Sequence, residues 1–301
     1  MLEKILPGFI IYNERKRKVI VENLLSVFDR RATSLDLKIS EISNIAPLAE
    51  FKNLTQLKLY RCEKLTDLAP VAELQKLKTL ILMDCIQVTD ITPVGELTEL
   101  TQLKISRCDK LRDIAVLRKL NKLKKLKISQ GSELEDISPI SELSELEELT
   151  ISGSSKLTDI SALSDLKKLN KVELSFCASL GDLSPLAGLE ELKKLNLYRC
   201  EELQDISPLS NLKSLVELHL MGCTKLSDLS PLGELSNLET LEISTMLFNN
   251  STKRLQKKLK KCNFKYKWNS PELYVSGMVI AGFLCLVALL TAILLKFFMI
   301  I

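Results

Sequence analysis

The sequence predicts an α/β repeat solenoid with one parallel β-sheet, followed by a single C-terminal transmembrane helix. The first observation behind this prediction is a 23-residue spacing of Leu that runs through most of the 301-residue chain. The second is an uncharged apolar stretch of 23 residues, Leu273–Leu295, near the C-terminus. A fixed period of this kind is typical of stacked repeats, in which each repeat buries its apolar face against the next.

Residues 1–33 precede the repeats and are predicted to form an N-terminal capping helix region. A helix is expected over Glu14–Arg31, with Asn13 as its N-cap and its apolar residues on one face. Such a helix would cover the first repeat, which otherwise exposes its core. The basic run Arg15–Lys18 is interpreted as a solvated helical turn, with a nuclear or lipid-binding signal as the alternative.

Residues 34–245 form the repeat region, with a short leading copy near Leu35, eight full repeats and one trailing strand. The L-x-L alternation predicts a short strand with one buried face. Ser or Thr before Pro is interpreted as an N-cap, which predicts a short helix or 3₁₀ turn. Two repeats have Val116 and Ala162 in place of Pro, so the turn is expected to tolerate its loss. The first Leu or Val of each strand is Leu57, Leu80, Leu103, Leu126, Leu149, Val172, Leu195, Leu218 and Leu241.

The repeated pattern L-x-x-L-x-L-x-x-C-x-x-L resembles the leucine-rich repeat family, whose repeats have roughly 20–29 residues and Asn or Cys at the ninth place. The added D-I-S-P-L phrase is similar to the repeats of bacterial internalins and of phosphatase-regulatory leucine-rich repeat proteins. The resemblance covers residues 35–245 and implies a horseshoe with a concave parallel sheet. Cys stands where these two subfamilies usually have Asn, so their activities are not transferred to this chain.

Two columns of identical residues are interpreted as structural ladders. The thiols lack the C-x₂₋₄-C pairing of zinc sites, which favours buried thiols that donate to loop carbonyls. The carboxylates are expected to accept bonds from backbone N–H groups of the following turn, with calcium binding as the alternative. Asn44 fills the same place in the short copy and accepts such bonds without charge. The Cys column is Cys62, Cys85, Cys108, Cys177, Cys200 and Cys223. The Asp column is Asp67, Asp90, Asp113, Asp136, Asp159, Asp182, Asp205 and Asp228.

The sequence predicts no catalytic residue, no metal ligand and no cofactor, and the chain is not expected to be an enzyme. It has one His, His219, and contains neither a nucleophile elbow nor a phosphate-binding loop. Residues 32–252 carry 26 basic and 33 acidic residues, a balance that disfavours nucleic acid as a partner. Pro7 and Gly8 interrupt the first apolar run, which is unlike a secretory signal. The thiols are therefore expected to be reduced and the repeats cytosolic.

The outward residues of the predicted sheet are the candidate partner-binding site. They include Tyr, Arg, Met and Phe, which are enriched in interface hot spots. The first half of this face leans basic and the second half acidic, which predicts a protein partner with complementary charge; a solvated face is the alternative. The candidate residues are Lys58, Tyr60, Arg61, Met83, Lys104, Arg107, Lys127, Glu173, Phe176, Tyr198, Arg199, His219 and Met221.

Residues 246–270 are predicted to form a basic C-terminal cap and juxtamembrane segment, with a helix over Thr252–Lys261. Eight positive charges fall within Lys253 to Lys267, where they are candidates for contact with anionic lipid. Cys262 is a candidate palmitoylation site.

Residues 271–301 are predicted to be the transmembrane anchor. A 23-residue helix over Leu273–Leu295 is about 34 Å long, enough for a hydrocarbon core of about 30 Å. Only Lys296 follows this stretch, so the positive-inside rule places the repeats in the cytosol and the protein is expected to be tail-anchored.

These features favour a membrane-anchored scaffold or adaptor that recruits a protein partner through its concave face. One alternative is a cell-surface receptor or adhesin with its repeats outside the cell. A second, implied by the family resemblance, is a regulator of a phosphatase-type enzyme.

Overall fold

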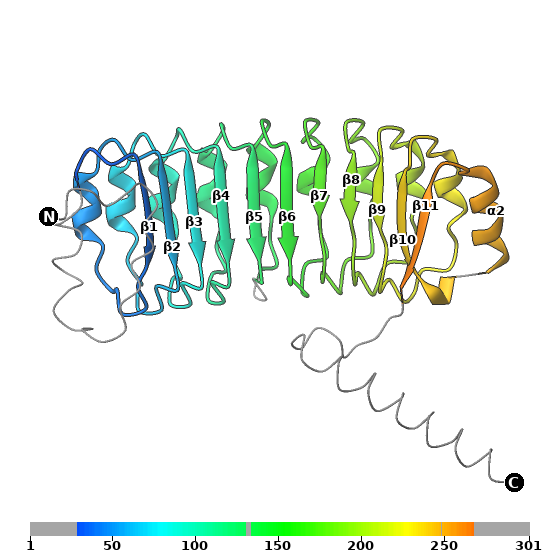
Figure 1. The fold of residues 1–301 in the computed structure, drawn as a ribbon, viewed down its shortest axis with the longest axis horizontal. Coiled ribbons are helices and arrows are strands. Elements are labelled where there is room, and N and C mark those ends of the chain that lie inside the picture. Colours follow the sequence, from blue (N-terminus) through cyan, green and yellow to red (C-terminus); the bar gives the residue numbers. More distant parts are fainter. Residues whose placement is uncertain (1–28, 131–133, 248, 268–301) are drawn as a thin grey trace, which may run out of the picture. The chain divides into compact units, whose positions relative to one another are not determined.

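The computed structural model describes residues 29–130, 134–247 and 249–267. Within them, eleven parallel strands form one sheet, and each strand pairs with the next along the chain. Figure 1 shows the strands side by side in one row from β1 to β11, with the helical turns behind them. The strands are β1 (Ser34–Lys38), β2 (Gln56–Tyr60), β3 (Thr79–Met83), β4 (Gln102–Ser106), β5 (Lys125–Ser129), β6 (Glu148–Ser152), β7 (Lys171–Glu173), β8 (Lys194–Asn196), β9 (Glu217–His219), β10 (Thr240–Ser244) and β11 (Asn263–Lys267).

The second layer consists of 3₁₀ turns, as the Ser-Pro and Thr-Pro pairs predicted. The turns without Pro, η4 and η6, form as well. A Cβ on Gly95 would lie 2.2 Å from Cγ2 of Val116, so a glycine in η3 makes room for the Val that replaces Pro in the next repeat. The turns are η1 (Ala46–Glu50), η2 (Ala69–Glu73), η3 (Thr92–Glu96), η4 (Ala115–Lys119), η5 (Ser138–Glu142), η6 (Ser161–Leu163), η7 (Ser184–Leu186), η8 (Ser207–Asn211), η9 (Ser230–Glu234) and η10 (Thr245–Leu247).

The core lies between the sheet and the turns and is built from columns of Leu, Ile and Val. The strands pair in register at the 23-residue period, so that Leu57 pairs with Leu80 and Leu103 with Leu126. In β2, β3 and β4 the second and fourth residues are buried, while the first, third and fifth face outward. The alternation of buried and outward residues predicted from L-x-L is confirmed in these strands.

The Asp column binds the backbone at the start of each turn, as predicted. In every full repeat Oδ1 accepts a hydrogen bond of 2.7–2.8 Å from the backbone N–H two residues later. Asn44 accepts the same bond from Ala46. The prediction that Ser or Thr is the N-cap was wrong, because these residues are the first residues of the turns. The Ser207 hydroxyl, for example, donates to Oδ2 of Asp205 at 2.8 Å.

The Cys column is buried, and its thiols donate to backbone carbonyls, as predicted. Sγ of Cys200 lies 3.1 Å from the Leu174 carbonyl oxygen, and Sγ of Cys223 lies 3.2 Å from that of Leu197. Burial raises the pKa of Cys177 to about 11 and that of Cys223 to about 12. These thiols therefore remain protonated at neutral pH, as expected of packing residues.

Opposite charges alternate between neighbouring repeats at the surface. Lys122 pairs with Glu99 at 2.6 Å, and Lys168 pairs with Glu145 at 2.6 Å, each over 23 residues. All four residues occupy the same place in successive repeats. Since stacked side chains of like charge repel each other, this alternation favours the observed register.

At the N-terminal end of the described residues, Arg30 contacts the two residues that end η1. Its guanidinium lies 5.4 Å from the centre of the Phe51 ring and pairs with Glu50 at 2.6 Å. The helix predicted over Glu14–Arg31 lies mostly outside the described residues. Its last three residues are described, and Arg30 and Arg31 form a turn. Phe51 is fully buried and occupies the place that Leu fills in later repeats.

The C-terminal end is closed by helix α2 (Asn250–Lys258) and by strand β11. The predicted helix exists, but it starts earlier, because the side chain of Asn249 accepts hydrogen bonds from the backbone N–H groups of Ser251 and Thr252. Leu255 and Leu259 are buried against the repeats, as predicted. Strand β11 was not predicted, although it pairs with β10 exactly one period later, Leu241 with Phe264.

The transmembrane helix predicted over Leu273–Leu295 lies outside the described residues. The chain divides into two compact units, Met1–Lys267 and Trp268–Ile301, and the second is not described. Among the residues that the structure describes, no helix combines the length and the apolar character needed to cross a membrane.

The Asp column yields a stability prediction at Asp228, whose carboxylate accepts bonds from the backbone N–H and the hydroxyl of Ser230. We expect Asp228→Ala to lower the free energy of unfolding by about 1 kcal/mol, the typical effect of losing a capping side chain. Asp228→Asn should cost less, because its amide oxygen accepts the backbone bond, as Asn44 does in the first repeat. Urea unfolding followed by circular dichroism measures both. Equal losses for Ala and Asn would contradict this role.

Candidate partner-binding face

The outward residues of the sheet form three rows that run across the strands. These rows hold the first, third and fifth residues of each five-residue strand and the matching positions of the shorter strands. We call them, together with the residue that follows the fifth position, the outer sheet face. The middle row holds Lys58, Lys104, Lys127, Glu173 and His219, and all of them face outward as predicted. Tyr60 and Met83 end β2 and β3 in the next row and are half-buried.

Six candidate residues do not lie on strands: Tyr198 and Met221 follow the shorter strands β8 and β9, and the other four share a different place in the repeat. The prediction placed Arg61, Arg107, Phe176 and Arg199 among the outward strand residues. They instead follow the outer row, in the left-handed region with φ between 53° and 58°. Simple alternation would turn Arg61 inward after Tyr60, and the left-handed conformation keeps its side chain at the surface. This slot recurs in every full repeat, and we call it the left-handed row: Arg61, Asp84, Arg107, Gln130, Gly153, Phe176, Arg199 and Gly222.

Most charges on the outer sheet face are paired with the neighbouring repeat. Lys58 contacts Asp36 at 3.1 Å, and Lys125 contacts Glu148 at 2.5 Å. In the left-handed row, Arg107 pairs with Asp84 of the preceding repeat. The sequence predicted a basic first half and an acidic second half of this face. In the structure, ion pairs within the face neutralise most of the charges in both halves.

Lys104 and Lys127 depart from this pairing. They are direct neighbours in β4 and β5, and among the described residues neither makes an ion pair. The two side chains line a shallow hollow of about 150 Å³ over β4–β7, together with Thr150 and Glu173. Because neither lysine has an acidic partner in the described part of the chain, positive charge is in excess at this position. Like charges on adjacent strands repel each other, which makes the arrangement unfavourable for the fold.

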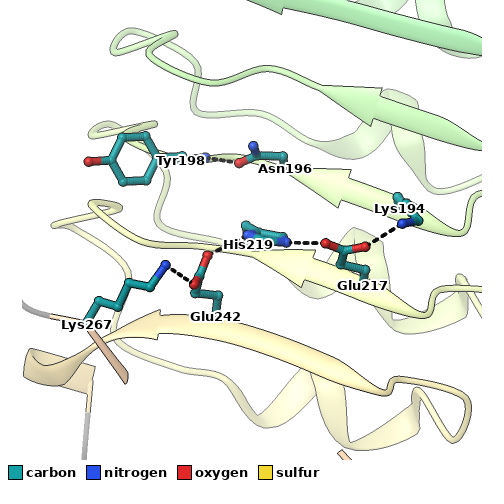
Figure 2. Close-up of polar contacts among 7 residues, drawn as sticks. All are labelled: Lys194, Asn196, Tyr198, Glu217, His219, Glu242 and Lys267. Atoms are coloured by element: carbon teal, nitrogen blue, oxygen red, sulfur yellow. Dashed lines mark hydrogen bonds and ion pairs between the residues drawn. The ribbon is translucent and has the colours of Figure 1, made fainter. Parts of the chain in front are cut away.

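Phe176, Tyr198 and Arg199 form a second cluster farther along the face. The two rings meet edge to face, with centroids 5.0 Å apart. The Arg199 guanidinium carbon lies 5.7 Å from the Phe176 centroid and 5.8 Å from the Tyr198 centroid. Asn196 fixes the backbone here, since its side-chain oxygen accepts a bond from the Tyr198 N–H (Figure 2). Phe176 remains 40% exposed.

His219 belongs to a series of hydrogen bonds and ion pairs that links β8 to β11 (Figure 2). Its Nδ1 lies 2.6 Å from Oε2 of Glu242, and its Nε2 lies 2.8 Å from Oε1 of Glu217. Each ring nitrogen therefore lies within hydrogen-bonding distance of a carboxylate oxygen. Lys194 pairs with Glu217 at 2.8 Å, and Lys267 pairs with Glu242. His219 thus joins neighbouring strands and is not a free contact group.

The pKa values of both carboxylates respond to this network. Hydrogen bonds from Lys194 and His219 hold the pKa of Glu217 below its ordinary value. Burial raises the pKa of Glu242, but the hydrogen bonds from Lys267 and His219 outweigh burial and lower it. Both carboxylates are therefore ionised at neutral pH.

Two other predictions change in the structure. Met221 was expected to face a partner, but it is only 8% exposed. Cys262 packs against the core, and burial raises its pKa to about 11, which disfavours the reactive thiolate.

The parallel sheet, the one-period register and the ladders of Asp and Cys define a leucine-rich repeat solenoid. The chain belongs to this family, because residues 72–225 match the family model described as "Plant disease resistance protein RPS2-like, leucine-rich repeats". No curated protein matches the chain.

Solved structures share the fold. Internalin C2 from Listeria monocytogenes is 28% identical, with a TM-score of 0.52 over 68% of this chain and 88% of that one. The mouse RP105/MD-1 complex is 22% identical, with a TM-score of 0.58 over 78% of this chain and 42% of that one. The Arabidopsis receptor kinase HAESA, solved with the peptide hormone IDA and the co-receptor SERK1, is 16% identical, with a TM-score of 0.51 over 71% of this chain and 39% of that one.

The charge network predicts loss of stability in acid. A carboxylate whose pKa is lowered by folding contributes stability above its unfolded pKa of about 4.5, and this contribution is lost as the pH falls through the folded pKa. We expect Glu242→Gln to lower the free energy of unfolding at pH 7 by about 1–3 kcal/mol, the typical worth of a hydrogen bond to a charged group. The difference from wild type should shrink below about pH 4.5.

Urea unfolding at a series of pH values measures this effect. Glu239→Gln is a matched control, because Glu239 is exposed just before β10 and makes no ion pair among the described residues. A Glu242→Gln deficit that stays constant from pH 7 to about pH 3 would rule out the charge network as its source.

Proposed function

We propose that this chain is a membrane-anchored scaffold that holds a protein partner against its outer sheet face. The observation that carries the proposal is the pair Lys104 and Lys127. Most charges on the face are offset by ion pairs with a neighbouring repeat, whereas these two lysines make no ion pair among the described residues and line a hollow. Acidic side chains of a partner would offset this positive charge, which supports a binding role for the face.

Proteins of the same fold support this role. The RP105 structure contains MD-1, and HAESA was solved with a peptide hormone and a co-receptor. Leucine-rich repeat proteins act in general as scaffolds for protein interaction, and a regular row of outward side chains suits that role. The proposal needs no cofactor and no metal ion.

The anchor in this proposal is Leu273–Leu295, an uncharged stretch long enough to span a bilayer. Positive charges precede it, and the positive-inside rule favours repeats that face the cytosol. Part of the basic segment is already used within the fold, since Lys258 pairs with Glu234 and Lys267 with Glu242. Contact with anionic lipid would therefore fall to Arg254, Lys257, Lys260, Lys261 and Lys265.

Charge reversal tests the binding role. We expect Lys104→Glu together with Lys127→Glu to reduce capture of the partner by about tenfold or more, because the added carboxylates repel an acidic segment. The full chain in detergent is used as bait, and bound proteins are quantified by mass spectrometry. Lys110→Glu is the control, because Lys110 lies on the turn after β4 and contacts Gln87. Equal capture by the double variant and wild type would refute this placement.

Protease accessibility tests the anchor and its orientation. If the repeats face the cytosol, a protease added to intact cells should leave them whole, while a protease added to inside-out vesicles should digest them. Digestion from outside intact cells would instead favour the receptor or adhesin alternative. Release of the full chain from membranes by carbonate washing would contradict the anchor itself.

A further inference from the structure

The left-handed row carries large side chains that the fold does not require. An L-residue in this region costs roughly 1–2 kcal/mol relative to a right-handed conformation, whereas glycine adopts it freely. Gly153 and Gly222 occupy the same slot with φ of 78°, so the slot accepts glycine. Its structural contact is made by the backbone alone: the Phe176 N–H donates to the Tyr198 carbonyl at 2.7 Å, and the Arg199 N–H to that of Met221 at 2.7 Å.

Phe176 and Arg199 differ from the other large residues of this row, because Phe176 is partly exposed and Arg199 has no carboxylate partner among the described residues. Arg107 has the Asp84 carboxylate as its partner, and Arg61 lies 3.9 Å from that of Glu63. Among the described residues, Arg199 has no carboxylate partner and is held only against the rings of Phe176 and Tyr198. Phe176 leaves 40% of its surface exposed.

Gly222 in the next repeat completes the arrangement. A Cβ at this position would lie 2.7 Å from Cγ of Arg199, so the absence of a side chain leaves room for the arginine stem. The arginine stem thereby lies beside the glycine and the guanidinium lies over the two rings, with N–H donors free for a ligand. A planar guanidinium held in this way is suited to a carboxylate, which it binds through two parallel hydrogen bonds.

We propose that the cluster of Phe176, Tyr198 and Arg199 anchors a protein segment in which Asp or Glu lies beside an apolar side chain. The carboxylate binds Arg199, and the apolar side chain covers Phe176. This inference rests on the proposed function and adds the chemistry of the partner. A nucleic acid fits less well, because residues 32–252 carry a net excess of acidic residues that repels a polyanion.

The glycine variants of the left-handed row separate binding from folding. Phe176→Gly and Arg199→Gly relieve the left-handed strain, which offsets the lost ring contacts and the added freedom of the unfolded chain, so both should unfold near the wild-type urea concentration. Each should weaken binding by about tenfold or more, as expected of a hot-spot residue. Gln130→Gly is the matched control in the same slot. Arg199→Lys keeps the charge but loses the two-bond geometry, and should fall between wild type and Arg199→Gly.

The probe is a displayed library of random peptides, selected on the full chain in detergent and on each variant. Wild type and Gln130→Gly should enrich peptides with Asp or Glu next to an apolar residue, and the Phe176 and Arg199 variants should not. Replacing the acid by Asn or Gln in a selected peptide should abolish binding. If all variants enrich the same peptides, the cluster is not the anchor although the protein-binding role stands. If wild type enriches none, both proposals fail.

Discussion

From β2 to β11, each paired strand residue lies beside the residue 23 positions away in the next strand, at a strand spacing of about 4.8 Å. This in-register stacking is the constraint on which the rest of the structure depends. A column of Leu side chains is stable over any number of repeats, because each added repeat buries apolar surface of its neighbour. A column of carboxylates is not, unless each is occupied by hydrogen bonds, and the Asp column meets this condition through the backbone of each turn.

The same constraint explains the surface. A charged residue repeated in every copy would face its own charge along the whole sheet, so Lys and Glu alternate between repeats, as at Glu99 and Lys122. Exceptions to the rule are informative for that reason. Lys104 and Lys127 stack like charges, and Phe176 and Arg199 take a strained conformation where glycine suffices. Neither feature is required by the repeat pattern, and both lie on the outer sheet face.

The C-terminal end of the sheet keeps the 23-residue period, but the residue types there no longer make the repeat recognisable in the sequence. Phe264 and Tyr266 fall one period after Leu241 and Ile243, yet they replace the aliphatic residues that identify a strand in the other repeats. An α-helix also replaces the 3₁₀ turn before them. Strand β11 closes the sheet with Lys265 and Lys267 on its outward side, and such charges at an edge strand disfavour pairing with another chain.

The repeat length, the parallel sheet, the buried columns and the acceptor role of Asp could be predicted from the sequence, because each depends on a residue type that recurs at a fixed spacing. Most of the outward strand residues could be predicted as well, since alternation sets their side. Which charges are paired is visible only in the folded protein, since a pair joins repeats and depends on how two particular side chains meet. The left-handed row and the His219 network are also visible only in the folded protein. A backbone conformation and a contact between strands cannot be predicted from the residue types of one repeat.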